Sequence, residues 1–344
     1  INGAMNVAQR STSTASQTTV DGYVCLDRWS IQTGSSGTFT HSQSSDVPTG
    51  YGFTKSLKID CTTADASPNY GLVRQRFEGQ NVQVLRKGTS SAVPVTLSFW
   101  VKSNLTGNFQ VNLQDIDTTN MRHIGATYSI SSANTWEKKE ITFAGDTTGA
   151  LDNDNACSFN VEWWLAAGST YNSGSVPTSW AVGTNANRAA GLNVSIGSST
   201  DNEFYLTGVQ LEIGEKATEF EHEPFETTLR KCQRYYCRTY TYGVATGTAT
   251  VLGAVTTQAE VASTAYSGSG CFEYPVEMRA APTITLYSTQ NADTTGKTTS
   301  DATDGNGTSY GVGSRSAFLF RNNDSSGVAL NSFLKVHATA SAEI

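Results

Sequence analysis

The sequence predicts an all-β protein with a jelly-roll sandwich, a short connecting α-helix and a second, smaller β-domain at the C-terminal end. Short runs in which apolar and polar residues alternate recur along most of the 344 residues, as they do in half-buried strands. Long connections rich in Gly, Ser, Asn and Asp separate these runs. One segment differs, because its apolar residues recur at helical spacing. The predicted parts are residues 1–222, the connecting helix 223–242 and residues 243–344.

The first part carries the clearest strand patterns. In VTLSFWVKS (95–103), apolar residues alternate along the whole run. In EFYLTGVQLEIG (203–214), the alternation changes phase across Gly208, which predicts a β-bulge. Many strands with one polar face, in roughly 200 residues, favour a jelly roll over a seven-stranded immunoglobulin-like domain. Further strands are expected over residues 54–62, 70–78, 108–114, 122–130, 136–143, 158–166 and 191–197.

The segment 223–242 is expected to form the connecting helix. Leu229, Cys232 and Tyr236 recur at helical spacing, with polar and basic residues between them. Two roles remain open for this helix. It is either a connector whose aromatic residues complete a core, or an interface with other copies of itself. In the second case Leu229, Cys232, Tyr235 and Tyr236 would supply the contact area.

The C-terminal part is expected to form a small β-domain. Its polar stretch 291–314 is expected to be a long surface loop. In 316–322 and 332–340, both faces of the expected strand carry apolar or aromatic residues. Such strands in a domain of about 100 residues need more cover than one small sandwich supplies, which predicts a homotrimer around an axis through this domain. The other strands are expected over residues 251–256, 271–278 and 282–288.

The composition disfavours several classes of partner. Charged residues make up 15% of the chain, whereas about 25% is typical. The formal net charge is −7, and no basic stripe occurs, so nucleic-acid binding is not expected. No run approaches the ~20 apolar residues that a spanning helix needs, so membrane insertion is not expected. The N-terminal stretch is polar and shows no signal peptide.

Cysteine, histidine and acidic residues indicate neither a catalytic site nor a cofactor. The six cysteines form no CxxC pair and are expected to be buried free thiols, with one or two long-range disulfides as the alternative. The four histidines match no metal-binding or catalytic motif. The segments 151–156 and 301–307 are rich in Asp and Asn but lack the EF-hand spacing, which leaves a calcium site there as an alternative only. No enzyme activity, cofactor or metal is therefore expected.

Three aromatic residues are candidates for binding a glycan. Trp164 lies on the opposite strand face from the apolar residues of 158–166. Tyr171 and Trp180 lie in the long polar loop that follows. An exposed aromatic ring packs well against the face of a sugar, and neighbouring amides bind its hydroxyls. The alternative is that the loop or a neighbouring subunit covers Trp164.

Several longer motifs occur in a defined order along the chain. This ordered set resembles a family of bacteriophage tail-fibre and other virion fibre proteins. In that family a jelly-roll domain similar to carbohydrate-binding modules precedes a CQRYY helix and a small β-domain, and the ending ATASAEI (338–344) is similar too. The motifs are INGAMNVAQRST (1–12), YVCLDRWS (23–30), VTLSFWVKS (95–103), NTWEKKEITF (134–143), VQLEIGEKATEFEHEPFETTLRKCQRYY (209–236) and YPVEMRAAPTITL (274–286).

The resemblance implies a place on the virion, usually trimeric assembly, other virion proteins as partners and no cofactor. The leading hypothesis is thus a non-enzymatic fibre subunit, from a tail fibre or related appendage, that binds a host-surface receptor or glycan. One alternative is a lectin-type carbohydrate-binding module. Another is a head-fibre or capsid-decoration protein with a mechanical role.

Overall fold

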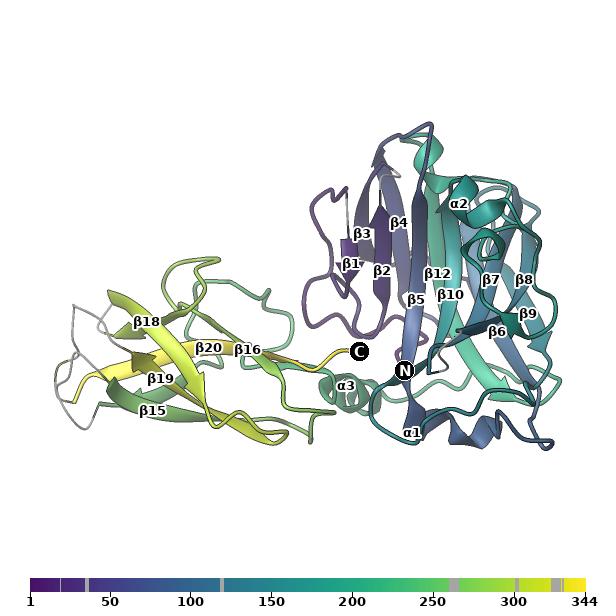
Figure 1. The fold of residues 1–344 in the computed structure, drawn as a ribbon. Coiled ribbons are helices and arrows are strands. Elements are labelled where there is room, and N and C mark those ends of the chain that lie inside the picture. Colours follow the sequence, from purple (N-terminus) through teal and green to yellow (C-terminus); the bar gives the residue numbers. More distant parts are fainter. Residues whose placement is uncertain are drawn as a thin grey trace. The chain divides into compact units, whose positions relative to one another are not determined.

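The computed structural model describes residues 1–18, 20–34, 37–117, 121–259, 266–300, 303–322, 329 and 331–344, with 266–269 and 320–322 described by their backbone only. The chain divides into two compact units. The first contains residues 1–8, 12–224 and 344, and the second contains residues 9–11 and 225–343. Both units are built from antiparallel strands, with short helical segments between them (Figure 1). The predicted all-β fold class, with a jelly-roll sandwich, is confirmed.

Two sheets face each other in the first unit (Figure 1). In the described part of the chain, one sheet has seven strands, in the order β1 (Val20–Gly22), β2 (Ser30–Gly34), β5 (Tyr70–Glu78), β10 (Cys157–Ala167), β7 (Gly107–Asp115), β8 (Arg122–Ile130) and β11 (Ala181–Val182). The other has five, in the order β3 (Thr38–Ser44), β4 (Ser56–Thr63), β12 (Glu203–Ile213), β6 (Val95–Ser103) and β9 (Glu137–Phe143).

Large aromatic side chains fill the space between these sheets. The ring of Trp163 on β10 lies 5.6 Å from that of Trp29 and 5.8 Å from that of Phe99 on β6. All three side chains are at most 1% exposed. Each removes a large apolar area from water, which stabilises the sandwich. The inward-facing half of each alternating sequence run is therefore the part that specifies the core.

The predicted bulge at Gly208 is confirmed. The register of β12 against β6 shifts between Thr207 and Gln210. Gly208 has a φ of 61°, and a Cβ there would lie 2.6 Å from Cζ of Phe53 and 2.9 Å from Cδ1 of Trp100. Both the backbone conformation and the packing therefore favour glycine.

The connections of the first unit contain α1 (Gly79–Val82), η1 (Gln83–Leu85), α2 (Ser169–Asn172), η2 (Asn185–Asn187) and η3 (Ile196–Ser198). Residues 168–191, here called the strap, leave the end of β10 and pack on the outer face of the seven-stranded sheet. The strand predicted over 191–197 is wrong. The backbone there makes a turn, with Leu192 N bonded to the Ala189 carbonyl at 2.9 Å, and then enters η3.

The second unit begins with α3 (Phe225–Gln233). Its described strands form one sheet in the order β13 (Tyr236–Arg238), β20 (Phe333–Ser341), β17 (Lys297–Ser300), β18 (Thr303–Tyr310), β19 (Ser316–Asn322) and β15 (Tyr266–Glu273). Strands β14 (Val255–Gln258) and β16 (Thr283–Tyr287) also pair with β20. Long β20 is thus the centre of this unit.

The connecting helix is shorter than predicted. It ends at Gln233, and Tyr235 N then closes a turn onto the Cys232 carbonyl at 2.9 Å. Tyr236 is therefore not helical, because it pairs with Ser341 of β20. Aromatic residues favour strands, and here the partner strand outweighs the helical spacing of the sequence.

The surface loop predicted over 291–314 is also wrong, because β17 and β18 lie within it. Thr298, Thr299 and Ser300 are buried although they are polar. The hydroxyl of Thr299 donates to the carboxylate of Asp304 at 2.8 Å. Hydrogen-bonded hydroxyls let such residues pack inside a sheet, so a search for alternating apolar residues misses these strands.

All six cysteines are free, which confirms the free-thiol prediction, although Cys271 is exposed and Cys157 is half-buried. Burial raises the pKa of the Cys237 thiol to about 12.

The face of β20 that carries His337 is covered by Tyr240 and Thr250 of the same chain. Around His337 this face is therefore covered from within the chain, whereas Phe333 on the same face is 54% exposed.

Candidate functional site

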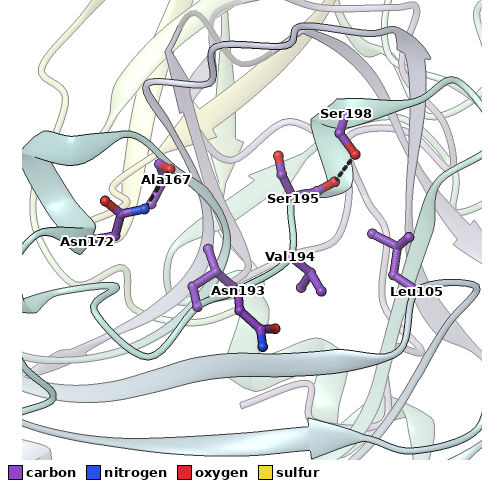
Figure 2. A pocket seen from close by; sticks show the side chains of 8 residues that line it. Leu105, Ala167, Asn172, Asn193, Val194, Ser195 and Ser198 are labelled. Carbon is purple, nitrogen blue, oxygen red and sulfur yellow. Dashed lines mark hydrogen bonds between the residues drawn. The ribbon is translucent and has the colours of Figure 1, made fainter.

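A pocket of about 410 Å³ opens in the first unit, where the connection from β6 to β7 meets the two ends of the strap (Figure 2). None of its eight lining residues has an ionisable side chain. Four offer carboxamide or hydroxyl groups, and the others are aliphatic. The lining residues are Leu105, Ala167, Asn172, Leu192, Asn193, Val194, Ser195 and Ser198.

Hydrogen bonds to the backbone hold the polar lining residues in place. Asn193 Oδ1 accepts from the backbone N of Asn108 at 2.7 Å, which orients its carboxamide. Asn172 Nδ2 donates to the Ala167 carbonyl at 3.3 Å. Ser198 Oγ donates to the Ser195 carbonyl at 2.8 Å, as Figure 2 shows. Each side chain therefore keeps part of its hydrogen-bonding capacity for a ligand.

The hydroxyl of Ser195 is different, because it is buried and has no partner among the described residues. An unpaired buried hydroxyl costs free energy, but this one lies beneath the pocket surface, out of direct reach of a ligand. The pocket thus combines fixed neutral donors and acceptors with aliphatic walls, at a volume typical of small-ligand sites. This chemistry suits an uncharged ligand rich in hydroxyl groups.

The prediction that Trp164 is an exposed binding surface is wrong. Its side chain is 0% exposed. The guanidinium of Arg188 lies 5.0 Å from its ring centre, and the ring of Tyr171 lies 5.2 Å away. Both belong to the strap, so the alternative that the following loop covers Trp164 is confirmed.

Tyr171 and Trp180 do not share one surface. The half-buried ring of Tyr171 contacts Trp164 and, at 5.6 Å, Tyr70. Trp180 Nε1 donates to the Ala144 carbonyl at 2.7 Å, and its ring lies 5.1 Å from the ammonium of Lys87. Trp180 therefore closes over a buried ion pair.

The residues predicted for a helix interface lie inside the second unit. Cys232, Tyr235 and Tyr236 are at most 6% exposed, and Leu229 is half-buried. The guanidinium of Arg10 lies 3.8 Å from the ring centre of Tyr236. This is the placement expected of a connector whose aromatic residues complete a core.

Acidic side chains of the described residues bond to protein groups rather than forming a metal site. Among the described residues, no group of three or more His, Cys, Asp or Glu side chains is arranged to hold a metal ion. Asp304, from the Asp-rich segment 301–307, accepts hydrogen bonds from Ser288, Thr299 and Asn291 instead. In the described part of the chain, no helix is long and apolar enough to cross a membrane.

The pocket residues were not found by sequence reasoning. Asn172 lies in the strap, and Asn193 and Ser195 lie in a segment expected to be a strand. Single Asn and Ser residues in polar loops form no periodic pattern. A run such as LNVSIGSS (192–199), in which small polar residues interrupt aliphatic ones, is the weak indication that the sequence contains.

Comparisons with known proteins add fold-level likeness only. No protein-family model matches the sequence, and a comparison with curated proteins gave no match. Among solved structures, the enzymatically active domain of tailspike protein 4 from bacteriophage CBA120 matches 54% of this chain at 12% identity and a TM-score of 0.33. This match spans only 19% of that protein's chain.

Two carbohydrate-binding modules also match. The CBM22-1 xylan-binding domain from Paenibacillus barcinonensis matches 61% of this chain and 100% of its own, at 10% identity and a TM-score of 0.32. The family 11 module from Clostridium thermocellum, in complex with a mixed-linked tetrasaccharide, matches 60% of this chain and 99% of its own, at 14% identity and a TM-score of 0.29. At identities and TM-scores this low, function has to be argued from the residues of this chain.

Proposed function

We propose that this chain is a non-enzymatic subunit of a phage virion fibre, and that its first unit binds a host-surface glycan in the pocket of Figure 2. The observation that carries the glycan-binding part is the uncharged lining of that pocket. Carboxamides and hydroxyls bind sugar hydroxyls without the desolvation cost of a charged group. Leu105, Leu192 and Val194 supply apolar contact area for the sugar's C–H groups.

The same lining supports binding without cleavage as part of the proposal. Glycosidases place two carboxyl groups about 5 to 9.5 Å apart across the bond that they break. Asp and Glu are absent from the eight residues that line this pocket. The pocket therefore holds a glycan without supplying an acid or a base.

The virion part of the proposal rests on the ordered motifs between residues 1 and 286 and on the C-terminal ending. It includes homotrimeric assembly and contact with other virion proteins. A head-fibre or decoration protein remains the second candidate, because the same motifs fit a mechanical role. A host-cell adsorption assay separates the two, since only a receptor-binding fibre competes with the phage for its host.

A glycan array with the full chain, followed by titration of the best ligand, tests the pocket. Asn193→Ala should weaken binding about tenfold, because a polar group of the ligand loses its partner. Leu105→Trp should abolish binding by filling the pocket. Asn153→Ala, at an exposed position away from the pocket, is the matched control and should bind normally. Unchanged binding by both pocket variants, or an array without any bound glycan, would overturn the proposal.

A further inference from the structure

The outer face of the seven-stranded sheet is polar although it is buried. Cross-strand register places its side chains in three rows across β5, β10, β7 and β8. These rows span roughly 13 Å along the strands and roughly 14 Å across them, from the usual strand spacings. The rows are Arg76–Asn160–Gln114–His123, Arg74–Glu162–Asn112–Gly125 and Leu72–Trp164–Gln110–Thr127. We call this surface the covered face.

The strap lies on the covered face through polar and aromatic contacts. Arg188 pairs with both carboxylate oxygens of Glu162, at 2.8 and 3.0 Å. Asn112 Nδ2 donates to the Arg188 carbonyl at 2.7 Å. Trp164 packs against Arg188 and Tyr171. Stacking on a tryptophan, combined with amide hydrogen bonds, is also how a protein surface holds a sugar.

The strap buries few of its own residues. Pro177 and Ala189 are the only buried residues within 168–191, a segment described throughout. Its regular structure is limited to the short elements α2, β11 and η2. Segments with few buried apolar contacts open at low free-energy cost. Most of its links to the sheet are hydrogen bonds, since β11 pairs with β8, Gln110 Nε2 donates to the Asn187 carbonyl at 3.0 Å and Gly191 N donates to Gln110 Oε1 at 2.7 Å. The Arg188–Glu162 ion pair adds a charged contact to these.

The strap leaves several polar groups of this region without partners. In the described part of the chain, no partner is present for Arg74 Nε, Arg188 Nε, Gln114 Nε2, Trp164 Nε1 or either ring nitrogen of His123. Arg74, Gln114, Trp164 and His123 are all at most 7% exposed. Except for the imidazole, these groups are hydrogen-bond donors only. A ligand that satisfies them must therefore be rich in acceptors.

The charges on the covered face also favour a ligand that is rich in acceptors. The floor of the covered face carries two guanidinium groups, from Arg74 and Arg76, and the one carboxylate of Glu162. Nη1 of Arg76 donates to the Ile344 carbonyl at 2.7 Å, so Arg74 carries most of this argument. Arg74 also reaches Asp21 at 3.2 Å, but that aspartate is 61% exposed at the edge of the sheet. Burial lowers the pKa of Arg74, which shows that its charge is poorly solvated. An anionic group on a ligand would compensate for the poor solvation of the Arg74 charge.

We propose that the covered face is a second glycan-binding site, that it takes an acidic, carboxylate-bearing oligosaccharide, and that the strap occupies it until the ligand displaces it. Trp164 stacks on a sugar ring, and Arg74, Arg76 and Gln114 bind the carboxylate and neighbouring oxygens. The size of the face fits two or three sugar units better than a single ion. This inference rests on the proposed glycan-binding function and names a ligand class for a different part of the same unit.

Titration calorimetry on the full chain tests this with trigalacturonate, α-2,8-linked trisialic acid and neutral galactotriose. The two acidic probes distinguish a uronate from a sialate source of the carboxylate. At least one of them should bind, and the neutral probe should not bind to the covered face. Arg74→Gln should weaken acidic-probe binding about tenfold, because a charged hydrogen bond is lost. Arg315→Gln, at a side chain that is 80% exposed in the second unit, is the matched control and should bind normally.

The substitution Glu162→Gln tests the proposal more directly than Arg74→Gln does. It weakens the link to Arg188 and removes the one negative charge from the floor, so acidic-probe affinity should rise roughly fivefold or more. Hydrogen exchange over 168–191 should become faster in the same variant. If neither acidic probe binds the wild-type chain or Glu162→Gln, or if Glu162→Gln leaves acidic-probe affinity unchanged, the covered face is a structural layer bridged by water. Asn193→Ala should leave acidic-probe binding intact, so a failure here and a failure of the pocket proposal are distinguishable.

Discussion

The imidazole of His337 lies flat against the ring of Tyr240, with ring centres 3.7 Å apart and an angle of 11° between the planes. Its Nε2 lies 3.1 Å from the Thr250 carbonyl oxygen, and its Nδ1 lies 2.9 Å from Oγ1 of Thr239. A carbonyl oxygen only accepts, so Nε2 carries a proton, whereas the Thr239 hydroxyl can either donate to Nδ1 or accept from it. The burial of the ring, which lowers the pKa of His337, therefore favours the neutral imidazole.

The first prediction concerns acid stability. Burial lowers the pKa of His337 to about 4, and burial also lowers the pKa of His41 in the first unit to about 4. An unfolded chain binds protons at these residues below about pH 6.5, whereas the folded chain does not. Stability present above pH 6.5 should thus be lost as the pH falls from 6.5 towards 4. Urea unfolding at a series of pH values measures this.

Two variants show which histidine causes the loss of stability at low pH. His337→Gln should reduce the acid sensitivity of the second unit, and His41→Gln that of the first, because neither replacement titrates. A stability that stays constant between pH 7 and pH 4.5 in the wild-type chain would show that these imidazoles bind protons as readily in the folded chain as in the unfolded chain. That result would contradict the neutral imidazole at Tyr240.

The second prediction concerns a buried charge cluster in the first unit. The ammonium of Lys87 contacts the carboxylates of Asp115 and Asp146 and the Gly149 carbonyl. The Lys87 and Asp115 side chains are 2% and 0% exposed. Lys87→Met should cost about 3 to 5 kcal/mol, because it leaves the Asp115 carboxylate buried without its cation. Chemical denaturation measures the change.

An exposed lysine is the control for this experiment. Lys138 pairs with Glu140 on the surface, where the two side chains are 35% and 50% exposed. Lys138→Met should change the free energy of unfolding by less than about 1 kcal/mol. Equal effects of the two substitutions would mean that the Lys87 cluster is open to water.

The third prediction concerns the CQRYY segment. Tyr236→Ala should destabilise the second unit by about 2 to 4 kcal/mol, since the ring is 6% exposed and its removal leaves a cavity. Arg230→Ala, on the exposed side of α3, should cost less than about 1 kcal/mol. Negligible effects of both substitutions would show that this segment is a tether rather than part of the packed unit.

Sequence patterns anticipated the parts of the fold that depend on apolar burial. Residues 70–78 and 122–130 match β5 and β8 to the residue, and the phase change at Gly208 marks a real bulge. The sequence patterns did not predict strands that are buried although their side chains are polar. The strand β17 is buried although it is polar, with the Thr299 hydroxyl bonded to Asp304, and no apolar alternation marks it.

The candidate sites were harder to predict than the strands. Trp164 was correctly placed on the outer face of β10, but strand parity cannot show that a loop returns to cover that face. The cover is held by long-range contacts, among them the pair between Arg188 and Glu162 and the hydrogen bond from Asn112 to the Arg188 carbonyl. Likewise Asn172 and Asn193 line one pocket only because the start of the strap and the segment after its end return to one place. Such meetings of distant loop residues are set by tertiary structure.

The last prediction concerns assembly of the second unit. Tyr310 on β18 and Phe318 on β19 are cross-strand partners, yet they are 72% and 49% exposed. Adjacent exposed aromatic rings on a sheet favour contact with another chain, and closed symmetry covers such a surface without endless polymerisation. Native mass spectrometry of the full chain should therefore give three copies. Tyr310→Lys should shift the mass towards the monomer, whereas Tyr51→Lys, at a tyrosine that is 55% exposed in the first unit, should leave the trimer intact. A stable wild-type monomer at micromolar concentration would contradict the fibre proposal and favour the lectin-type module, because a monomer has no need of this exposed aromatic pair for assembly.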